Sequence, residues 1–445
     1  MAFRDIRKQR KWLSAEEIRL LAVGVIILAM MLAANVALAR VLPSGEWLYQ
    51  RWSGARAFLL EIFELSQGAK GARILPEGTL AVLDNTPGPY STEIAQRTQE
   101  RVYDRRAFSS EYTYVLNDPF FILLLYSPLA LIPDFTLARG IWMLVAQVVL
   151  LGIVLLAFNL SEWQPRRWLY VLLLGFGLFQ YFSLNALVTA TPAIFLTVLY
   201  LSILLALRSY SDEMAGVLLS LVAYQWEVGG LFFVFILFFA FTNRRWGVLA
   251  GLGMALFVLL VVSFLTNSGW GLPYIRAALS AWIRGANLTL GYILTTWLPN
   301  LRFPPGPIAS IALGIMLFIE WFDSVHAHFR RVVWTASLSL AATPLMGFPI
   351  FSSNHVVLIL PFILILALVW ERWQRYRTLR VVLLLLLVLL LPFGMYYRVV
   401  SVYDPLMLDL ISVLPPVAAI LGLYWMRWWV LRSPQTLFQR FGDHA

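Results

Sequence analysis

The chain has 445 residues, of which 60% are hydrophobic and only 13% charged, and its mean hydropathy of +0.76 excludes an ordinary soluble globular domain. The absence of cysteine excludes disulfides, thiolate catalysis and cysteine-based metal sites. The net charge of +10 implies no nucleic-acid partner, because the positive residues fall mostly in short loops between apolar segments, where anionic lipid accounts for them.

The apolar segments are continuous and lack the two-residue alternation of barrel strands. The sequence therefore predicts an all-α, polytopic transmembrane helix bundle. Because a helix needs roughly 17 to 25 apolar residues to cross a bilayer, we expect about 12 or 13 membrane helices. The predicted crossings lie near residues 20–41, 136–159, 168–183, 188–207, 213–226, 229–242, 246–266, 307–322, 332–348, 354–371, 380–396 and 408–426.

Basic residues in the short loops predict the orientation, since Lys and Arg resist translocation. The N-terminal tail 1–19, the C-terminal tail 427–445 and loops such as Arg244-Arg245 and Arg330-Arg331 are expected in the cytoplasm. The remaining loops are then extracytoplasmic, namely 42–118, 184–191, 226–229, 267–306, 349–353 and 397–407. Residues 119–426 form the multi-helix membrane domain in this interpretation.

The segment 119–133 does not fit this threading. If the loop 42–118 is outside and Arg166-Arg167 inside, only one of the segments 119–133 and 136–159 crosses the membrane. We expect Phe120–Ile132, which is short, to be re-entrant or interfacial. A local exception to the positive-inside rule is the alternative.

The loop 42–118 contains two predicted helices. The first runs from Trp47 to about Leu65 and places apolar residues at helical spacing, which is typical of a helix on the membrane surface. The second starts after Ser91, a favoured N-cap, with Glu93 in its first turn.

A second external element runs from Tyr274 to Gly285 and also alternates apolar residues with charged ones. Its two arginines, Arg276 and Arg284, are candidates for holding a lipid phosphate beside the outer headgroups. The alternative is that both side chains only extend to the headgroup region while their stems cover apolar surface.

The order of motifs along the chain resembles that of a known family. The motifs are Gly45-Glu46-Trp47, Tyr49, Ala55-Arg56-Ala57, Pro89-Tyr90-Ser91, Asp118-Pro119-Phe120 and the segment 128–133. In this order the chain resembles the bacterial polyprenyl-phosphate-dependent mannosyltransferase-like proteins of glycosyltransferase family 87, within the GT-C superfold. The similarity covers most of residues 20–300.

Three positions depart from the pattern of that family. Glu46 stands where members usually have Asp, and Ala190-Thr191-Pro192 stands where they commonly have Gly-Gln. Trp226-Glu227-Val228 stands where many have Lys-Pro-Gln. An aromatic ring and a carboxylate thereby replace a potential phosphate-binding cation.

The resemblance implies transfer of a mannose-like sugar from a polyprenyl-phosphate donor to a hydroxyl of a glycan or glycolipid acceptor, at the outer face of the plasma (inner) membrane. An acid of the first external loop is the general base in that superfold, and Glu46 is its counterpart here. The donor is a substrate, and no cofactor is implied. The residues name no metal site and do not decide a divalent-cation requirement. Neither a phosphate-binding loop motif nor a dinucleotide fingerprint is present, so nucleotide-sugar use is not expected.

Each candidate acid also has a structural interpretation. Glu46 would otherwise be a solvated acid at a helix exit. Glu227 lies between two short apolar segments and is either a second acid or one partner of a structural salt bridge. Asp118 is a weaker candidate acid, because Asp before Pro readily caps a helix.

The candidate cations and contact residues are weighed in the same way. Arg51 and Arg56 are candidates for binding the donor phosphate, and headgroup contact is their simpler role. Tyr49, Trp226 and His355 are candidates for sugar or lipid contact, although a lone histidine at a helix start is more often a hydrogen-bonded core or cap residue. Two other functions stay open from the sequence: a non-catalytic relative that binds lipid-linked sugars, and a transporter of them.

Overall fold

The computed structural model describes residues 15–42, 44–66, 89–108, 111–112, 114–300, 303–373, 376–402 and 404–431. Helices are the only regular secondary structure in these ranges, which confirms the predicted fold class. The bounds are α1 Ala15–Val41, α2 Glu46–Ser66, α3 Thr92–Tyr103, α4 Phe120–Ala130, α5 Phe135–Ser161, α6 Arg167–Phe179, α7 Tyr181–Thr189, α8 Ala193–Arg208, α9 Asp212–Val222, α10 Trp226–Thr242, α11 Trp246–Thr266, α12 Gly271–Arg284, η2 Gly285–Leu288, α13 Leu290–Trp297, α14 Pro305–Asp323, α15 Phe329–Ala342, η3 Thr343–Leu345, η4 Ser352–Leu358, α16 Ile359–Arg372, α17 Arg377–Val402 and α18 Pro405–Leu431.

Seven of the described helices are long and apolar enough to cross a membrane, or up to eight if the bent pair α6 and α7 is one span. The predicted number was larger because several apolar runs are broken. The run near 168–183 bends by 41° between Phe179 and Tyr181, and those near 188–207, 213–226 and 229–242 form helices of 16, 11 and 17 residues. The outer parts of both tails, 1–14 and 432–445, lie outside the described residues.

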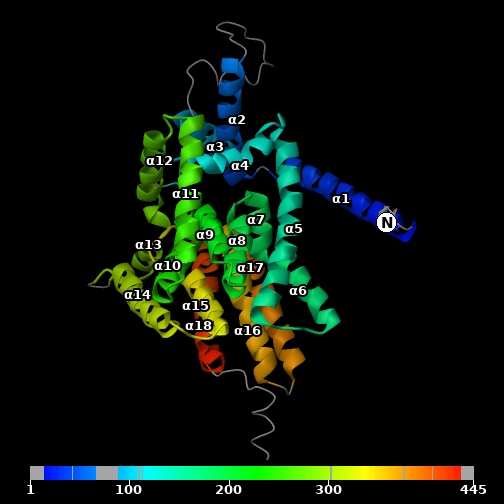
Figure 1. Cartoon of the computed structure of the whole chain (residues 1–445), viewed down its shortest axis with the longest axis vertical. Coiled ribbons are helices and arrows are strands. Elements are labelled where there is room, and N and C mark those ends of the chain that lie inside the picture. Colours follow the sequence, from blue (N-terminus) through cyan, green and yellow to red (C-terminus); the bar gives the residue numbers. More distant parts are fainter. Residues whose placement is uncertain are drawn as a thin grey trace, which may run out of the picture.

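The predicted cytoplasmic loops meet at one end of the bundle. Arg208, after α8, pairs with Glu162, after α5, at 2.8 Å, and its guanidinium lies over the ring of Phe329 at the start of α15. At the other end, α2, α3 and α4 lie together, and α1 leaves the bundle at a steep angle (Figure 1). The described helices of the long loop and the basic loops thus occupy opposite ends.

Helix α2 packs against protein, so the prediction of a membrane-surface helix is wrong for its described side chains. Trp52, Ala55 and Phe58 are only 8%, 0% and 5% exposed, and the ring of Phe58 contacts that of Phe120 in α4 at 4.7 Å. A stripe of apolar residues fits a lipid surface and a protein groove equally well. The apolar helix α4, distant in sequence, supplies the groove.

Helix α4 does not run from one end of the bundle to the other. It has 11 residues, which is about 16 Å of helix. Both of its ends contact α2: Arg51 pairs with Asp118 before α4, and the indole of Trp52 donates a hydrogen bond to the carbonyl of Ile132 after it, at 3.2 Å. Helix α4 is thus too short for a straight crossing, and its re-entrant or interfacial position stays a prediction.

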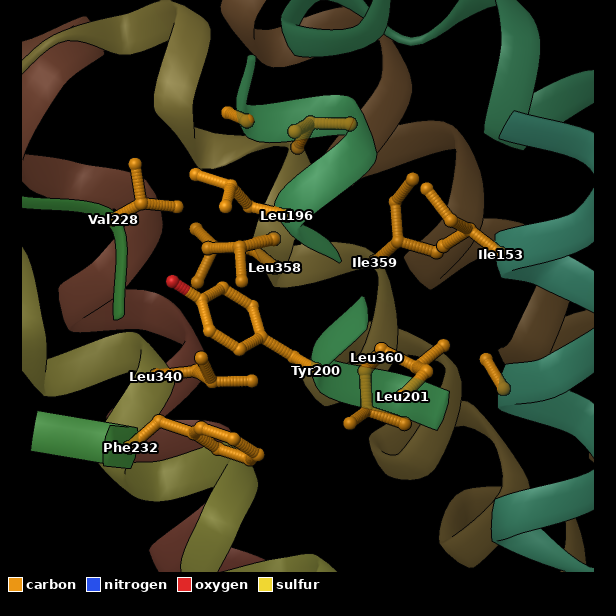
Figure 2. Packing of buried hydrophobic residues seen from close by; sticks show 14 of the residues in the cluster. Ile153, Leu196, Tyr200, Leu201, Val228, Phe232, Leu340, Leu358, Ile359 and Leu360 are labelled. Carbon is orange, nitrogen blue, oxygen red and sulfur yellow. The ribbon is translucent and has the colours of Figure 1, made fainter. Parts of the chain in front are cut away.

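The buried core lies below this end, between α5, α8, α10, α15 and α16. Figure 2 shows the ring of Tyr200 of α8 among Leu358, Leu340 and Phe232, and its centroid is 4.9 Å from that of Phe232. Beside this core, α9 and α11 approach closely, because a Cβ on Gly216 would lie 2.1 Å from a backbone oxygen of α11. Small residues at such contacts are typical of membrane helix packing.

Candidate active site

Glu46 is the first residue of α2 and lies at the mouth of the bundle. Its side chain is 7% exposed, and Oε2 accepts hydrogen bonds from the Ser44 hydroxyl at 2.9 Å and the Gly45 amide at 3.0 Å. The chain turns into α2 at Gly45, where φ is +96° and a Cβ would lie 2.8 Å from the Arg139 side chain. Only glycine satisfies both conditions without strain.

Arg139 of α5 lies behind this turn and is fully buried. Its guanidinium donates hydrogen bonds to the carbonyl oxygens of Leu42 at 2.6 Å and of Val188 at 2.7 Å. Arg139 thereby connects the entry of α2 to the end of α7. Its Nε has no hydrogen-bond partner among the described residues.

Arg101 of α3 brings a second positive charge to the same region. Its guanidinium lies over the rings of Tyr49 and Phe135, 5.2 and 4.5 Å from their centroids, and its buried Nε is also without a partner in the described part of the chain. Tyr49, a predicted sugar or lipid contact, is half-buried here against Phe135, at 5.0 Å between centroids.

The surroundings of Glu46 shift its acidity in the direction that a general base needs. Burial raises the pKa of Glu46 above its ordinary value of 4.5, while hydrogen bonds from the backbone and from Ser44, and the charge of Arg139, act in the opposite direction. A carboxylate with a raised pKa accepts a proton more readily near neutral pH.

A second charged cluster lies one turn further along α2. Arg51 Nε is 2.6 Å from Asp118 Oδ2, and a terminal nitrogen donates to Oδ1 at 3.0 Å; both side chains are fully buried. The Tyr90 hydroxyl donates to the Asp118 carbonyl at 2.8 Å. Arg51 also donates to the Trp47 carbonyl at 2.7 Å.

This cluster corrects two expectations from the sequence. Asp118 does not cap α4, because Pro119 takes the N-cap position. Arg51 is neither a headgroup contact nor a free phosphate ligand, since Asp118 already neutralises it. The two residues are 67 positions apart, so local sequence patterns do not reveal the pair.

Glu227 lies in the first turn of α10, near this pair. Its charge interacts with those of Asp118 and Arg51, and its buried Oε2 has no hydrogen-bond partner among the described residues. The predicted salt bridge of Glu227 is not found in the described part of the chain. Of the two carboxylates, only Asp118 binds Arg51, and Glu227 lies beside the pair without an ion-pair partner among the described residues.

An aromatic wall separates the two clusters. The ring of Trp47 contacts those of Tyr112, Tyr114 and Phe351 with centroids 5.9, 5.7 and 5.1 Å apart. Glu46 precedes Trp47 on one side, and Arg51 binds the Trp47 carbonyl on the other. Trp47 and Tyr112 are only 4% and 8% exposed, so these rings pack on one another and hold the start of α2 in place.

An apolar groove of about 320 Å³ runs beside these clusters between α4, α5, α8 and α9. Tyr126 in its lining lies 5.9 Å from the Arg51 guanidinium, and Ile141 and Trp142 in its lining follow Arg139 on α5. Leu125 and Val145 are exposed along it, at 62% and 46%. The groove therefore opens to the surface that lipid would cover.

The remaining predicted cations do not join Glu46. Arg56 donates to the Ala130 carbonyl at 3.3 Å and lies over the ring of Trp52, so it fixes α4 against α2. Arg276 is exposed on α12 and lines a different cavity. The side chain of Arg284 lies outside the described residues.

Two predicted contact residues also lie apart from Glu46. His355 is buried in η4, and its Nε2 lies 2.6 Å from the Ser412 carbonyl, which confirms the interpretation as a hydrogen-bonded core residue. Trp226 is 45% exposed and its ring contacts Phe233 of the same helix.

The sequence analysis missed Arg139 and Arg101. Arg139 had a usable signal, because it is a charged residue inside the predicted crossing 136–159, where such residues are usually functional. Arg101 had none, since it is one of several arginines in a long polar loop.

The long apolar helices and the arrangement of their loops define the class: the chain is a polytopic helical membrane protein with a buried polar site at one end of its bundle. Comparisons with models of protein families, with curated proteins and with solved structures found no match for it. The resemblance to glycosyltransferase family 87 stays a prediction.

Proposed function

We propose that the protein is an integral membrane glycosyltransferase. It transfers a mannose-like sugar from a polyprenyl-phosphate donor to an acceptor hydroxyl at the outer face of the plasma membrane. The observation that carries this proposal is the buried Glu46 carboxylate at the mouth of the bundle, with Arg139 and Arg101 beside it.

Glu46 acts as the general base in this proposal. It takes the proton of the acceptor hydroxyl while the acceptor oxygen forms a bond to the anomeric carbon of the sugar. The bond between that carbon and the phosphate oxygen breaks, and the phosphate leaves with the electron pair. The positive charges of Arg101 and Arg139 favour the developing negative charge in this desolvated region.

The isoprenoid chain of the donor occupies the apolar groove between α4, α5, α8 and α9. A groove lined by apolar side chains on lipid-facing helices suits an isoprenoid, and its lining includes the α5 residues that follow Arg139. The donor phosphate would then lie at the end of the groove lined by Ile141 and Trp142, toward Arg101 and Arg139.

Purified protein in lipid nanodiscs with a lipid-linked sugar tests the proposal. We expect Glu46→Gln to lower the transfer rate by about 10²- to 10⁴-fold, the usual contribution of a general base. Glu93→Gln is the matched control, because Glu93 is a partly exposed acid of α3 that pairs with Arg97. Full turnover by the Glu46→Gln protein would remove Glu46 as the base.

A second candidate function is binding of lipid-linked sugars without transfer. It is favoured by the hydrogen bonds that Glu46 Oε2 already accepts from Ser44 and Gly45, and Glu46 does not line the groove. In the same assay this function predicts saturable retention of the donor with no transfer to any acceptor. Transfer that depends on Glu46 would eliminate it.

A further inference from the structure

A cavity of about 550 Å³ separates α3 from α12 at the same end of the molecule. One wall is a face of α3 with Ser91, Thr92 and Gln96, and the other is a face of α12 with Arg276 and Ser280. Tyr90 and Tyr274 bring the two walls together, with ring centroids 6.1 Å apart. Neither Glu46 nor Asp118 lines this cavity.

The cavity carries net positive charge. Its described lining includes Arg106 and Arg276 and no carboxylate. Arg106 is held by a neutral group, since it donates to the Gln96 amide oxygen at 3.1 Å. The adjacent Arg105 contrasts with it, because both terminal nitrogens of Arg105 bind Glu111 at 2.7 Å.

The start of α3 adds hydrogen-bond donors to this charge. The Ser91 hydroxyl accepts from the Ile94 amide and caps the helix, as the sequence predicted. Ser91 and Thr92 line the cavity, so the positive end of the helix dipole lies at its wall. Glu93 in that first turn is balanced by Arg97 at 2.7 Å. It does not line the cavity.

Helix α12 places the cavity beside the surface that lipid would cover. Leu272, Ile275, Leu279 and Trp282 are 59%, 54%, 53% and 72% exposed, and they recur at helical spacing on one face. The face that lines the cavity carries Arg276 and Ser280. An amphipathic helix of this kind is typical of the headgroup layer.

We propose that the cavity between α3 and α12 binds a phosphate group, separately from the site at Glu46. Two guanidinium groups on opposite walls, hydroxyls on both and the start of a helix give a tetrahedral anion donors from several directions. The phosphate belongs either to a phospholipid headgroup or to a soluble phosphorylated molecule. The chemistry of recognition is the same for both.

Binding by the full-length protein in maltoside detergent, which contains no phosphate, tests this site without relying on sugar transfer. The two probes are phosphatidylglycerol, titrated by native mass spectrometry, and glycerol 1-phosphate, titrated by calorimetry. We expect Arg106→Gln/Arg276→Gln to weaken binding of the recognised probe at least tenfold. Arg105→Gln removes one positive charge beside Arg106 but outside the cavity, and this variant should bind as the parent protein does.

The outcomes separate the two sources of phosphate. Binding of phosphatidylglycerol alone assigns a lipid headgroup, and saturable binding of glycerol 1-phosphate assigns a soluble ligand. Unchanged binding by the double variant, or equal loss in Arg105→Gln, would overturn the site, as would binding of neither probe. A thermal unfolding curve for each variant verifies that it is folded. Failure of sugar transfer would leave these measurements unaffected.

Discussion

Two buried charged clusters lie on successive turns of α2, and they are built in opposite ways. Arg51 and Asp118 neutralise each other: Nε lies 2.6 Å from Oδ2, a terminal nitrogen donates to Oδ1 at 3.0 Å, and both side chains are fully buried. In the described part of the chain, Glu46 accepts hydrogen bonds only from neutral donors. The neighbouring Arg139 donates its hydrogen bonds to backbone carbonyl oxygens and not to a carboxylate.

The difference indicates that the Arg51–Asp118 pair stabilises the fold and that Glu46 is the group available for catalysis. A charge that a protein partner neutralises has little left to offer a substrate. A desolvated carboxylate whose charge is only partly compensated can still exchange a proton. Glu227 is intermediate between the two clusters. It lies beside the Arg51–Asp118 pair, but its Oε2 has no hydrogen-bond partner among the described residues.

Removing one partner of the buried Arg51–Asp118 ion pair should give the largest effect on stability. We expect Arg51→Met to lower the free energy of unfolding by about 3–5 kcal/mol, because it leaves Asp118 buried without a counter-charge. Arg51→Met/Asp118→Leu should regain most of that loss. Unfolding in detergent by denaturant or heat measures both. A mild effect of the single substitution would mean that water reaches the pair.

The exposed pair Arg208 and Glu162 is the control for this experiment. Their side chains are 35% and 56% exposed, so Arg208→Met should cost about 1 kcal/mol or less. An equal cost at the two pairs would contradict the contrast between a buried and an exposed ion pair.

The pH dependence of stability tests the opposite character of Glu46. Because the folded pKa of Glu46 is raised above 4.5, the folded state binds more protons than the unfolded state between the two pKa values. Stability should therefore fall as pH rises through that window, with a slope of at most about 1.4 kcal/mol per pH unit. Glu46→Gln should remove this fall. Parallel pH profiles for the two proteins would show that Glu46 is not desolvated.

Catalysis should depend on pH in the opposite sense. The base must be ionised, so the transfer rate should rise with pH through the raised pKa of Glu46 while stability declines. An acidic limb at the ordinary glutamate value would separate the base from Glu46.

The turn before Glu46 should show a smaller effect. Gly45→Ala should cost about 1–2 kcal/mol, because alanine disfavours a positive φ and its Cβ would press on Arg139. Gly24→Ala is the matched control, since a Cβ there meets nothing within 4 Å. Thermal unfolding measures the difference. Equal behaviour of the two variants would contradict the constraint at Gly45.

Local sequence patterns predicted the helical features of the candidate site but not its pairing. The Ser91 cap with Glu93 in the next turn is a local signal, and the structure confirms it. The helix at Trp47–Leu65 was also predicted, but its apolar face was assigned to lipid. Packing against α4 decided otherwise, because periodicity records that a face is buried and not what buries it.

The sequence by itself determined that this is an all-helical membrane protein, because long apolar runs act locally through the cost of desolvating the backbone. Only the tertiary structure decided that Asp118 belongs to Arg51, that Arg139 and Arg101 lie beside Glu46, and that α12 and α3 enclose a basic cavity. These relations join residues far apart in the chain. Their energies depend on distance and burial, which no local pattern specifies.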